Sequence, residues 1–351
     1  MVQYSSIRFW KDKTERDRTL DRLLALRSGI AEQISPNSKL SSFHLATWNI
    51  RDLGSTKFNP RARLPESLFY IAEMISAFDL VAIQEVNDHL TEFESIMKLL
   101  GPHWTYIVTD ASGNQERLAF AYDTRKILFR RIAGEIVLPK TKAGNPIQFN
   151  RTPFLVAFQA GWFKFNICTV HILFGDDDDL TGRINEIEAI SKFFEKRQEK
   201  DGESYILLGD FNILNPKDAT MKALKSGGFT IPDNLMIPSN LRGGKYYDQI
   251  AFRGAKKEAE IVDANVFKWQ DYVFRDGNDF ESYKPYMEKD IATGKKLKLT
   301  PAGFKSWRTW QISDHLPMWA EIKIDFTDDY LKSLSGSKPL ANMKKARKED
   351  V

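Results

Sequence analysis

The stretch Tyr205-Ile206-Leu207-Leu208-Gly209-Asp210-Phe211-Asn212 indicates the fold class of this 351-residue chain. Its apolar run predicts a strand buried on both faces, because parallel strands inside α/β domains are continuously hydrophobic. The run ends at Gly209, and a carboxylate and an amide follow, two residues apart. Burying an ionised Asp is costly unless a cation or several hydrogen-bond donors meet it. The strand end therefore predicts a functional site.

Polar side chains occupy the ends of four other predicted strands. An amide, a carboxylate and an imidazole follow three of these strands, and a carboxylate beside an imidazole precedes the last strand, at residues 319–324. The groups are Asn49, Gln84-Glu85, His171 and Ser313-Asp314-His315. Five polar strand ends in one chain favour a convergent polar pocket.

The order of these groups, together with Tyr247-Asp248, resembles the endonuclease/exonuclease/phosphatase superfamily and, within it, the deoxyribonuclease I-like proteins. The resemblance runs from about Phe43 to about Phe326, which is most of the chain. It implies a four-layer α/β sandwich, in which two packed mixed β-sheets are flanked by helices. The alternation of buried strands and amphipathic helices agrees with an α/β fold.

Composition limits the expected compartment and partners. The single cysteine, Cys168, rules out an intrachain disulfide, so we expect a reducing compartment and a cytoplasmic location. The N-terminal segment has no long apolar stretch, so we expect neither a signal peptide nor a membrane span. The net charge of +4 permits a polyanionic substrate without requiring one.

We divide the chain into an N-terminal extension (1–42), a catalytic domain (43–326) and a basic tail (327–351) that we expect to be disordered. Aromatic and basic residues alternate in a long insertion within the domain, at residues 262–311. Insertions of this length are uncommon unless they have a function or are disordered, and the aromatics argue against disorder. This insertion either forms a substrate-facing wall or packs as an enlarged edge.

The N-terminal extension contains a predicted amphipathic helix near residues 14–33. Four apolar residues fall roughly on helical spacing within this charged segment: Leu20, Leu23, Leu24 and Ile30. We expect the helix to cap the domain, and docking of a protein partner is the alternative. Two further helices are predicted at residues 64–78 and 182–200.

The residue types favour an oxygen-bound metal. No Cys/His cluster at zinc spacing is present in the sequence, and hard oxygen ligands select Mg²⁺ or Mn²⁺. The family resemblance implies that Asn49 and Glu85 hold this cation, with Glu85 as the dominant ligand. By the same resemblance, Asp314 either binds the metal or fixes its loop.

The resemblance also assigns catalytic roles. Asp210 would orient or deprotonate the attacking water, or contact the metal, and Asn212 would donate to a non-bridging phosphate oxygen. Their i, i+2 spacing places both side chains on one face of an extended chain. His315 is the candidate general base or transition-state donor, since an imidazole suits proton transfer near neutral pH. Asp248 would hold its other nitrogen or contact the phosphate.

A second imidazole, His171, resembles the family histidine that contacts the scissile phosphate. Glu116 is placed as the carboxylate that orients it, although Arg117 could equally be the functional residue of that segment. Arg151 resembles an arginine that contacts substrate phosphate, a task that suits a guanidinium because it forms bidentate hydrogen bonds.

Two functions follow from this set of residues. The first is a metal-dependent nuclease that acts on DNA, with endonucleolytic cleavage favoured. The alternative is a phosphatase or phosphodiesterase for inositol phosphates, lipid headgroups or other small organophosphates, although the basic residues usual beside the inositol phosphatase motifs are missing. A non-catalytic relative is disfavoured, because Glu85, Asp210 and His315 are all retained.

Overall fold

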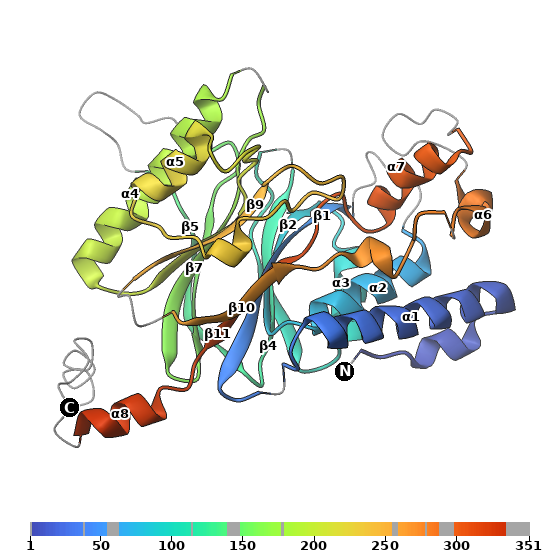
Figure 1. The fold of residues 1–351 in the computed structure, drawn as a ribbon, viewed down its shortest axis with the longest axis horizontal. Coiled ribbons are helices and arrows are strands. Elements are labelled where there is room, and N and C mark those ends of the chain that lie inside the picture. Colours follow the sequence, from blue (N-terminus) through green and yellow to red (C-terminus); the bar gives the residue numbers. More distant parts are fainter. Residues whose placement is uncertain are drawn as a thin grey trace.

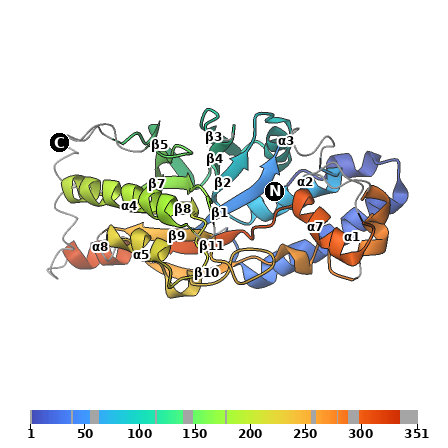
Figure 2. The ribbon, with the colours of Figure 1, turned by 90° about the horizontal axis from the view of Figure 1, so that it is seen from above.

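The computed structural model describes residues 2–37, 39–54, 63–113, 115–138, 148–176, 179–254, 259–277, 279–287 and 298–334. Two β-sheets pack face to face, and helices flank them (Figures 1 and 2). The four-layer α/β sandwich predicted from the sequence is therefore confirmed.

The larger sheet contains the strands β1 (Ser42–Leu53), β2 (Leu80–Val86), β3 (Trp104–Val108), β4 (Arg117–Asp123), β10 (Ile261–Val266) and β11 (Met318–Lys323). Their spatial order is β10-β11-β1-β2-β4-β3. Strand β1 pairs parallel to β2 and antiparallel to β11, so the sheet is mixed. Most residues of β1 and β2 are buried, as expected for central strands covered on both faces.

The smaller sheet contains the strands β5 (Ile127–Glu135), β6 (Phe154–Ala160), β7 (Phe163–His171), β8 (Tyr205–Asp210) and β9 (Asp248–Arg253), in that order. Strand β8 pairs parallel to β7 and antiparallel to β9. All six residues of β8 are buried, which confirms the central strand predicted from its apolar run.

Aromatic side chains fill the space between the two sheets. The Phe43 ring of β1 lies 5.4 Å from the Phe165 ring of β7, and the Phe120 ring of β4 lies 5.8 Å from the Phe158 ring of β6, measured between centroids. Pairs of this kind contribute beyond their buried area. The inter-sheet core thus fixes the strand ends of one sheet relative to those of the other.

Helices cover the outer faces. Helices α4 (Thr181–Asp201) and α5 (Ala219–Ser226) pack on the smaller sheet, where Ile187, Ile190 and Phe194 join its outward-facing apolar residues. Helices α1 (Lys13–Gln33), α2 (Pro65–Ser76) and α3 (Thr91–Leu100) lie together beside the larger sheet (Figure 1). The remaining helices are α6 (Phe280–Tyr283), α7 (Pro301–Gln311), α8 (Thr327–Leu334) and the 3-10 turns η1 (Ser5–Phe9), η2 (Asp233–Leu235), η3 (Trp269–Asp271) and η4 (Lys284–Tyr286).

The N-terminal helix α1 packs on the domain, but its packed face matches the predicted one only in part, through Leu23 and Ile30. Leu23 and Leu26 are buried, whereas Leu20 and Leu24 are 41% and 68% exposed. A Cβ at Gly29 would lie 2.1 Å from the Tyr272 ring, so a glycine lets the helix approach the insertion closely. The prediction erred for Leu20 and Leu24 because the leucines are clustered at positions 20, 23, 24 and 26, so the sequence does not define a single apolar face.

Polar contacts hold α1 against α2 and against the 262–311 insertion. The Arg18 guanidinium pairs with the buried Glu66 carboxylate at 3.0 Å. At the C-terminal end of α1, the Gln33 side-chain amide donates a hydrogen bond to the Tyr272 hydroxyl at 2.6 Å. The extension is therefore an integral part of the packed structure.

Most aromatics of the insertion are packed inside it. The buried aromatics are Phe267, Trp269, Phe274, Phe280, Tyr283, Phe304, Trp307 and Trp310. The interpretation as an enlarged, packed edge is confirmed for these side chains, and the alternative, that they face substrate, is wrong for them. Burial within the domain is favoured because removing an aromatic ring from water stabilises the folded state. The basic run Lys295-Lys296 lies outside the described residues.

The first part of the predicted tail is helical. Residues 327–334 form helix α8, where the sequence predicts disorder, and its Tyr330 ring lies 5.4 Å from the Trp162 ring. Residues 335–351 lie outside the described part of the chain. Among the described residues, no helix combines the length and the apolar character that crossing a membrane requires.

Two leucines of α1 test the packing of the extension. We expect Leu26→Ala to lower the free energy of unfolding by about 2–5 kcal/mol, because Leu26 is fully buried. The matched change Leu24→Ala, on the exposed face, should change it by less than about 0.5 kcal/mol. Urea denaturation of both variants measures the free energy of unfolding. Equal losses would show that α1 does not pack as described.

Candidate active site

Strand register in the smaller sheet places three predicted site residues side by side. His171 at the end of β7 is paired with Asp210 of β8, and Asp210 is paired with Asp248 of β9. Directly opposed residues on neighbouring strands share a face of the sheet. One imidazole and two carboxylates therefore form a row across three strands, and each is at most 5% exposed.

The backbone around Asp210 is tightly constrained. Gly209 has φ +128°, and a Cβ there would lie 2.1 Å from the Val170 carbonyl oxygen, so only glycine fits. Asn212 has φ +53°, in the left-handed region, and its N–H donates to Asp210 Oδ1 at 2.9 Å. Its side-chain amide donates to the Ile172 carbonyl at 2.7 Å, which fixes the group predicted to meet phosphate.

The larger sheet contributes Asn49 and Glu85. Asn49 Nδ2 donates to Glu85 Oε1 at 2.8 Å and to Asp210 Oδ2 at 3.0 Å, so this amide links the strand ends of the two sheets. Glu85 has φ +61°, a conformation that costs about 1–2 kcal/mol in a non-glycine residue. Such strain at a strand end is typical of a functional position.

His315 is held by Asp248. Its Nδ1 lies 2.8 Å from Asp248 Oδ2, and its Nε2 lies 3.7 Å from Asp210 Oδ2. Burial opposes the charged ring, but Asp248 and Asp210 outweigh it and hold the pKa of His315 well above 6.5. Burial also raises the pKa of Asp248 above 3.8, against the opposing effect of His315. The structure thus shows the imidazole–carboxylate pair that the sequence predicts.

His171 is held in a similar way by Glu116. Its Nδ1 lies 2.9 Å from Glu116 Oε2, which also lies 2.7 Å from Arg151 Nε, and its Nε2 lies 3.6 Å from Asp210 Oδ2. Burial would raise the pKa of Glu116, but His171 and Arg151 outweigh it and lower the pKa to about 2. Burial would lower the pKa of His171, but Glu116 and Asp210 raise it.

One buried group within the described residues could hold a metal ion. Ligand atoms of Asp210, Asp248 and His315 all lie within 4.8 Å of one another. Two further oxygens, Asn49 Oδ1 and Asp248 Oδ1, are buried without a hydrogen-bond partner, as expected where a cation completes the site. Oxygen donors of this kind fit a hard divalent cation. Asn49 and Glu85 remain predicted metal ligands, and Asn49 is hydrogen-bonded to Asp210.

Two predicted side chains, Arg117 and Asp314, form their ion pairs with residues outside this cluster. Arg117 pairs with the exposed Asp110 carboxylate at 2.9 Å and donates to the Thr109 carbonyl at 3.0 Å. Asp314, whose side chain is 45% exposed, pairs with Arg51 at 3.3 Å. The sequence left open whether Glu116 or Arg117 is the functional residue, and the structure places Glu116 in the cluster.

The region from residue 46 to residue 315 matches the Endonuclease/Exonuclease/phosphatase family. This region covers most of the chain and includes every residue of the cluster described above. The chain belongs to this family. The family assignment made from the sequence is confirmed, and the protein is an endonuclease/exonuclease/phosphatase-family hydrolase.

Curated relatives of this family member are deoxyribonucleases. The deoxyribonuclease of Thioalkalivibrio sp. (strain K90mix) is 28% identical over 227 residues, which cover 61% of this chain and 59% of the relative. Deoxyribonuclease-1 of Homo sapiens is 29% identical over 185 residues, which cover 49% of this chain and 61% of the relative. The chain thus spans about three fifths of the length of these relatives.

Solved structures of the family share the fold. A family protein from Bacteroides thetaiotaomicron has a TM-score of 0.53 at 16% identity, over 81% of this chain and 96% of its own. A mannosyl-6-phosphatase from the same species also has a TM-score of 0.53 at 16% identity, over 80% and 99%. At this identity the likeness concerns the fold alone.

The structure adds site residues that the sequence analysis missed. The Arg51 guanidinium lies 3.7 Å from the Trp310 ring centroid and pairs with Asp314. The Asp52 N–H donates to Glu85 Oε2 at 2.9 Å, and burial together with Glu85 raises the pKa of its carboxyl to about 7. Both residues lie in the last part of β1, two and three positions after Asn49, and that proximity in the chain was the available signal.

A second missed feature is a clamp between Glu92 and Arg63. The Glu92 carboxylate accepts from the N–H groups of Gly54 and Arg63, at 3.0 and 2.8 Å. The buried Arg63 guanidinium pairs with Glu92 at 2.7 Å and donates to the Arg51 carbonyl. The clamp therefore positions the segment that donates to Glu85. No sequence motif marks either residue.

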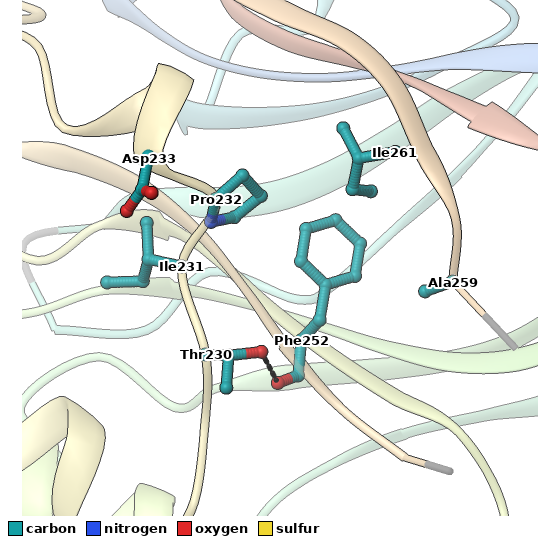
Figure 3. A pocket seen from close by; sticks show the side chains of 7 residues that line it. All are labelled: Thr230, Ile231, Pro232, Asp233, Phe252, Ala259 and Ile261. Atoms are coloured by element: carbon teal, nitrogen blue, oxygen red, sulfur yellow. Dashed lines mark hydrogen bonds between the residues drawn. The ribbon is translucent and has the colours of Figure 1, made fainter. Parts of the chain in front are cut away.

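A separate pocket of about 320 Å³ lies beside β9 and β10 (Figure 3). Its lining consists of Thr230, Ile231, Pro232, Asp233, Phe252, Ala259 and Ile261. The lining is mainly apolar, and Asp233 is its only carboxylate. No residue of the His171–Asp210–Asp248 row belongs to it, so we assign the reaction to the strand ends and not to this pocket.

Glu116 should couple the stability of the protein to pH. Its folded pKa of about 2 lies below the ordinary 4.5, so its stabilisation is present above pH 4.5 and is lost as the pH falls toward 2. The full effect is on the order of 3 kcal/mol. We expect wild type to be more stable than Glu116→Gln at neutral pH, with the difference narrowing below about pH 5.

Denaturant unfolding from pH 7 down to pH 3 measures this difference. Glu94→Gln, on the exposed face of α3, is the control and should follow wild type at every pH. A gap between Glu116→Gln and wild type that stays constant with pH would contradict the assignment.

Proposed function

We propose that the protein is a divalent-metal-dependent phosphodiesterase that cleaves DNA, with endonucleolytic cleavage favoured. The observation that carries this proposal is the pair of imidazoles that flank Asp210. His171 Nε2 and His315 Nε2 lie 3.6 and 3.7 Å from Asp210 Oδ2, and each ring is held from behind by a carboxylate. Ester hydrolysis requires one proton acceptor and one proton donor, and two oriented imidazoles suit both tasks.

The donor set supports a Mg²⁺ or Mn²⁺ cofactor. Asn49, Glu85 and Asp210 converge from both sheets, and the orphaned Asn49 Oδ1 is buried at their meeting point. These residues would hold the cation. When bound, it supplies positive charge that stabilises the negative charge developing on the phosphate.

The protein side chains then account for the proton transfers. The positive charge of a bound cation would lower the raised pKa of the His315 ring. The neutral ring, held by Asp248, then accepts a proton from the attacking water, and Asp210 orients that water. The water oxygen forms a bond to phosphorus as the bond to the leaving ester oxygen breaks. His171, held by Glu116, donates its proton to the leaving oxygen, which departs as a hydroxyl. The products are an alcohol and a phosphomonoester, so atoms and charge balance.

DNA as the substrate is supported by the relatives. Proteins named deoxyribonuclease from a bacterium and from mammals share 24–29% identity with this chain. Arg151, which is 8% exposed and paired with Glu116, adds a guanidinium beside the His171 imidazole. Guanidinium groups suit phosphate oxygens geometrically.

His315→Ala tests the proton-transfer role. Loss of a positioned imidazole should lower kcat at least about 10²-fold. His103→Ala, at an exposed turn before β3, should retain wild-type turnover. The measurement is initial velocity on a fluorescent duplex, after circular dichroism has shown that both variants are folded. Wild-type turnover in His315→Ala would reject the role.

The substrate class is tested by hydrolysis of supercoiled plasmid in Mg²⁺ and in Mn²⁺. We expect wild type to nick the plasmid and Asp210→Asn to leave it intact, because the isosteric amide removes the charge on which both imidazoles converge. Inositol phosphates and sugar phosphates are assayed in parallel. Phosphate release from these small molecules with an intact plasmid would replace the nuclease proposal by the phosphatase alternative.

A further inference from the structure

The segment of residues 239–247, which we call the 239–247 loop, is tied to the catalytic histidine. The Leu241 N–H donates to the Asp314 carbonyl, and the Leu316 N–H donates to the Ser239 carbonyl, both at 2.7 Å. Asn240 forms an isolated β-bridge with His315. The loop also ends directly at Asp248, the first residue of β9. It therefore forms one border of the candidate active site.

The tip of the loop is a closed turn that stands clear of the domain. Gly243 and Gly244 have φ of +78° and +84°, and a Cβ at either would meet no atom within 4 Å. Asn240 closes the turn, because its carbonyl accepts from the Gly243 N–H and its side chain accepts from the Lys245 N–H, both at 2.9 Å. The shape of the loop is thus set before any ligand arrives.

Two cationic side chains flank this tip, and neither is paired with another described residue. Arg242 is exposed and Lys245 is half-buried, and neither side chain forms an ion pair or a hydrogen bond with another described residue. Other arginines near the site are neutralised, since Arg151 pairs with Glu116 and Arg63 pairs with Glu92. On the neighbouring segment, the Asp314 carboxylate pairs with Arg51. Among the described residues nothing neutralises the positive charge that the loop presents beside the site.

Aromatic rings continue this surface toward the reacting groups. The Tyr247 ring stacks on the His315 ring at 5.3 Å and 30°, and it meets the Phe174 ring edge-on at 6.3 Å. Phe174 is 36% exposed. A combination of cations that follow a phosphate backbone with aromatic faces suits a nucleic-acid strand better than a small ester.

We propose that the 239–247 loop binds the polynucleotide strand next to the scissile phosphate, with Arg242 and Lys245 contacting the flanking phosphodiesters. This proposal rests on the proposed nuclease function and identifies what makes a polymer the preferred substrate. A small ester ends at the reacting phosphate and offers no flanking charge to these side chains. A polynucleotide offers one charge per nucleotide, and neutralising it releases counterions.

The double variant Arg242→Ala/Lys245→Ala tests the loop. We expect the KM for a duplex oligonucleotide to rise about 10-fold, and the slope of log KM against log salt concentration to fall by about 1–2, since each lost phosphate contact removes about 0.9. The ratio of kcat/KM for DNA to kcat/KM for bis(4-nitrophenyl) phosphate should fall by a similar factor. The charge-preserving variant Arg242→Lys/Lys245→Arg should retain the wild-type slope.

The matched control is Lys196→Ala/Lys200→Ala, which removes two exposed lysines from α4. This part of α4 leads into the start of β8, at the opposite end of that strand from Asp210. If the loop variant and the control share one KM and one salt slope on DNA, the loop proposal is overturned while the nuclease proposal stands. If wild type hydrolyses bis(4-nitrophenyl) phosphate but not DNA, the nuclease proposal fails, and the loop proposal fails with it.

Discussion

The buried negative charge of Asp210 is the constraint to which the rest of the site responds. Its carboxylate is 1% exposed, and burial alone would raise its pKa. The charges of His315 and His171 and donors from Asn49 and Asn212 outweigh burial, and the pKa is lowered. These partners come from both sheets, so the inter-sheet core has to place them within hydrogen-bond reach. The packing that joins the two sheets therefore also brings the site residues together.

The sequence predicts the strand ends well, because a buried carboxylate after an apolar run has few structural explanations. It also predicts the His315–Asp248 pair through family resemblance, although the two residues are 67 positions apart. Strand register cannot be read from the chain, and so the row formed by His171, Asp210 and Asp248 emerges only in the structure. The Arg63–Glu92 clamp was missed for a similar reason, since neither residue lies in an apolar or polar pattern.

Predictions for the peripheral parts were weaker, because solvent-facing and packed side chains look alike in a charged segment. Leu24 was assigned to the packed side of the first helix, yet it is 68% exposed. The aromatics of residues 262–311 were compatible with two environments, and most of them are buried, largely against one another and, for Phe274, against Tyr70 of α2. Helix α7, at the end of this insertion, leads directly into the His315 segment, and its Trp310 contacts Arg51. The packed edge thereby supports the rim of the site.

The left-handed backbone at Glu85 and Asn212 has an evolutionary consequence. At each position a glycine would adopt the observed φ with less strain, yet it would remove a side chain on which the proposed reaction depends. Selection for thermal stability alone would thus favour glycine at these two positions, where the substitution removes activity. The site limits how stable this chain can become while it remains an enzyme.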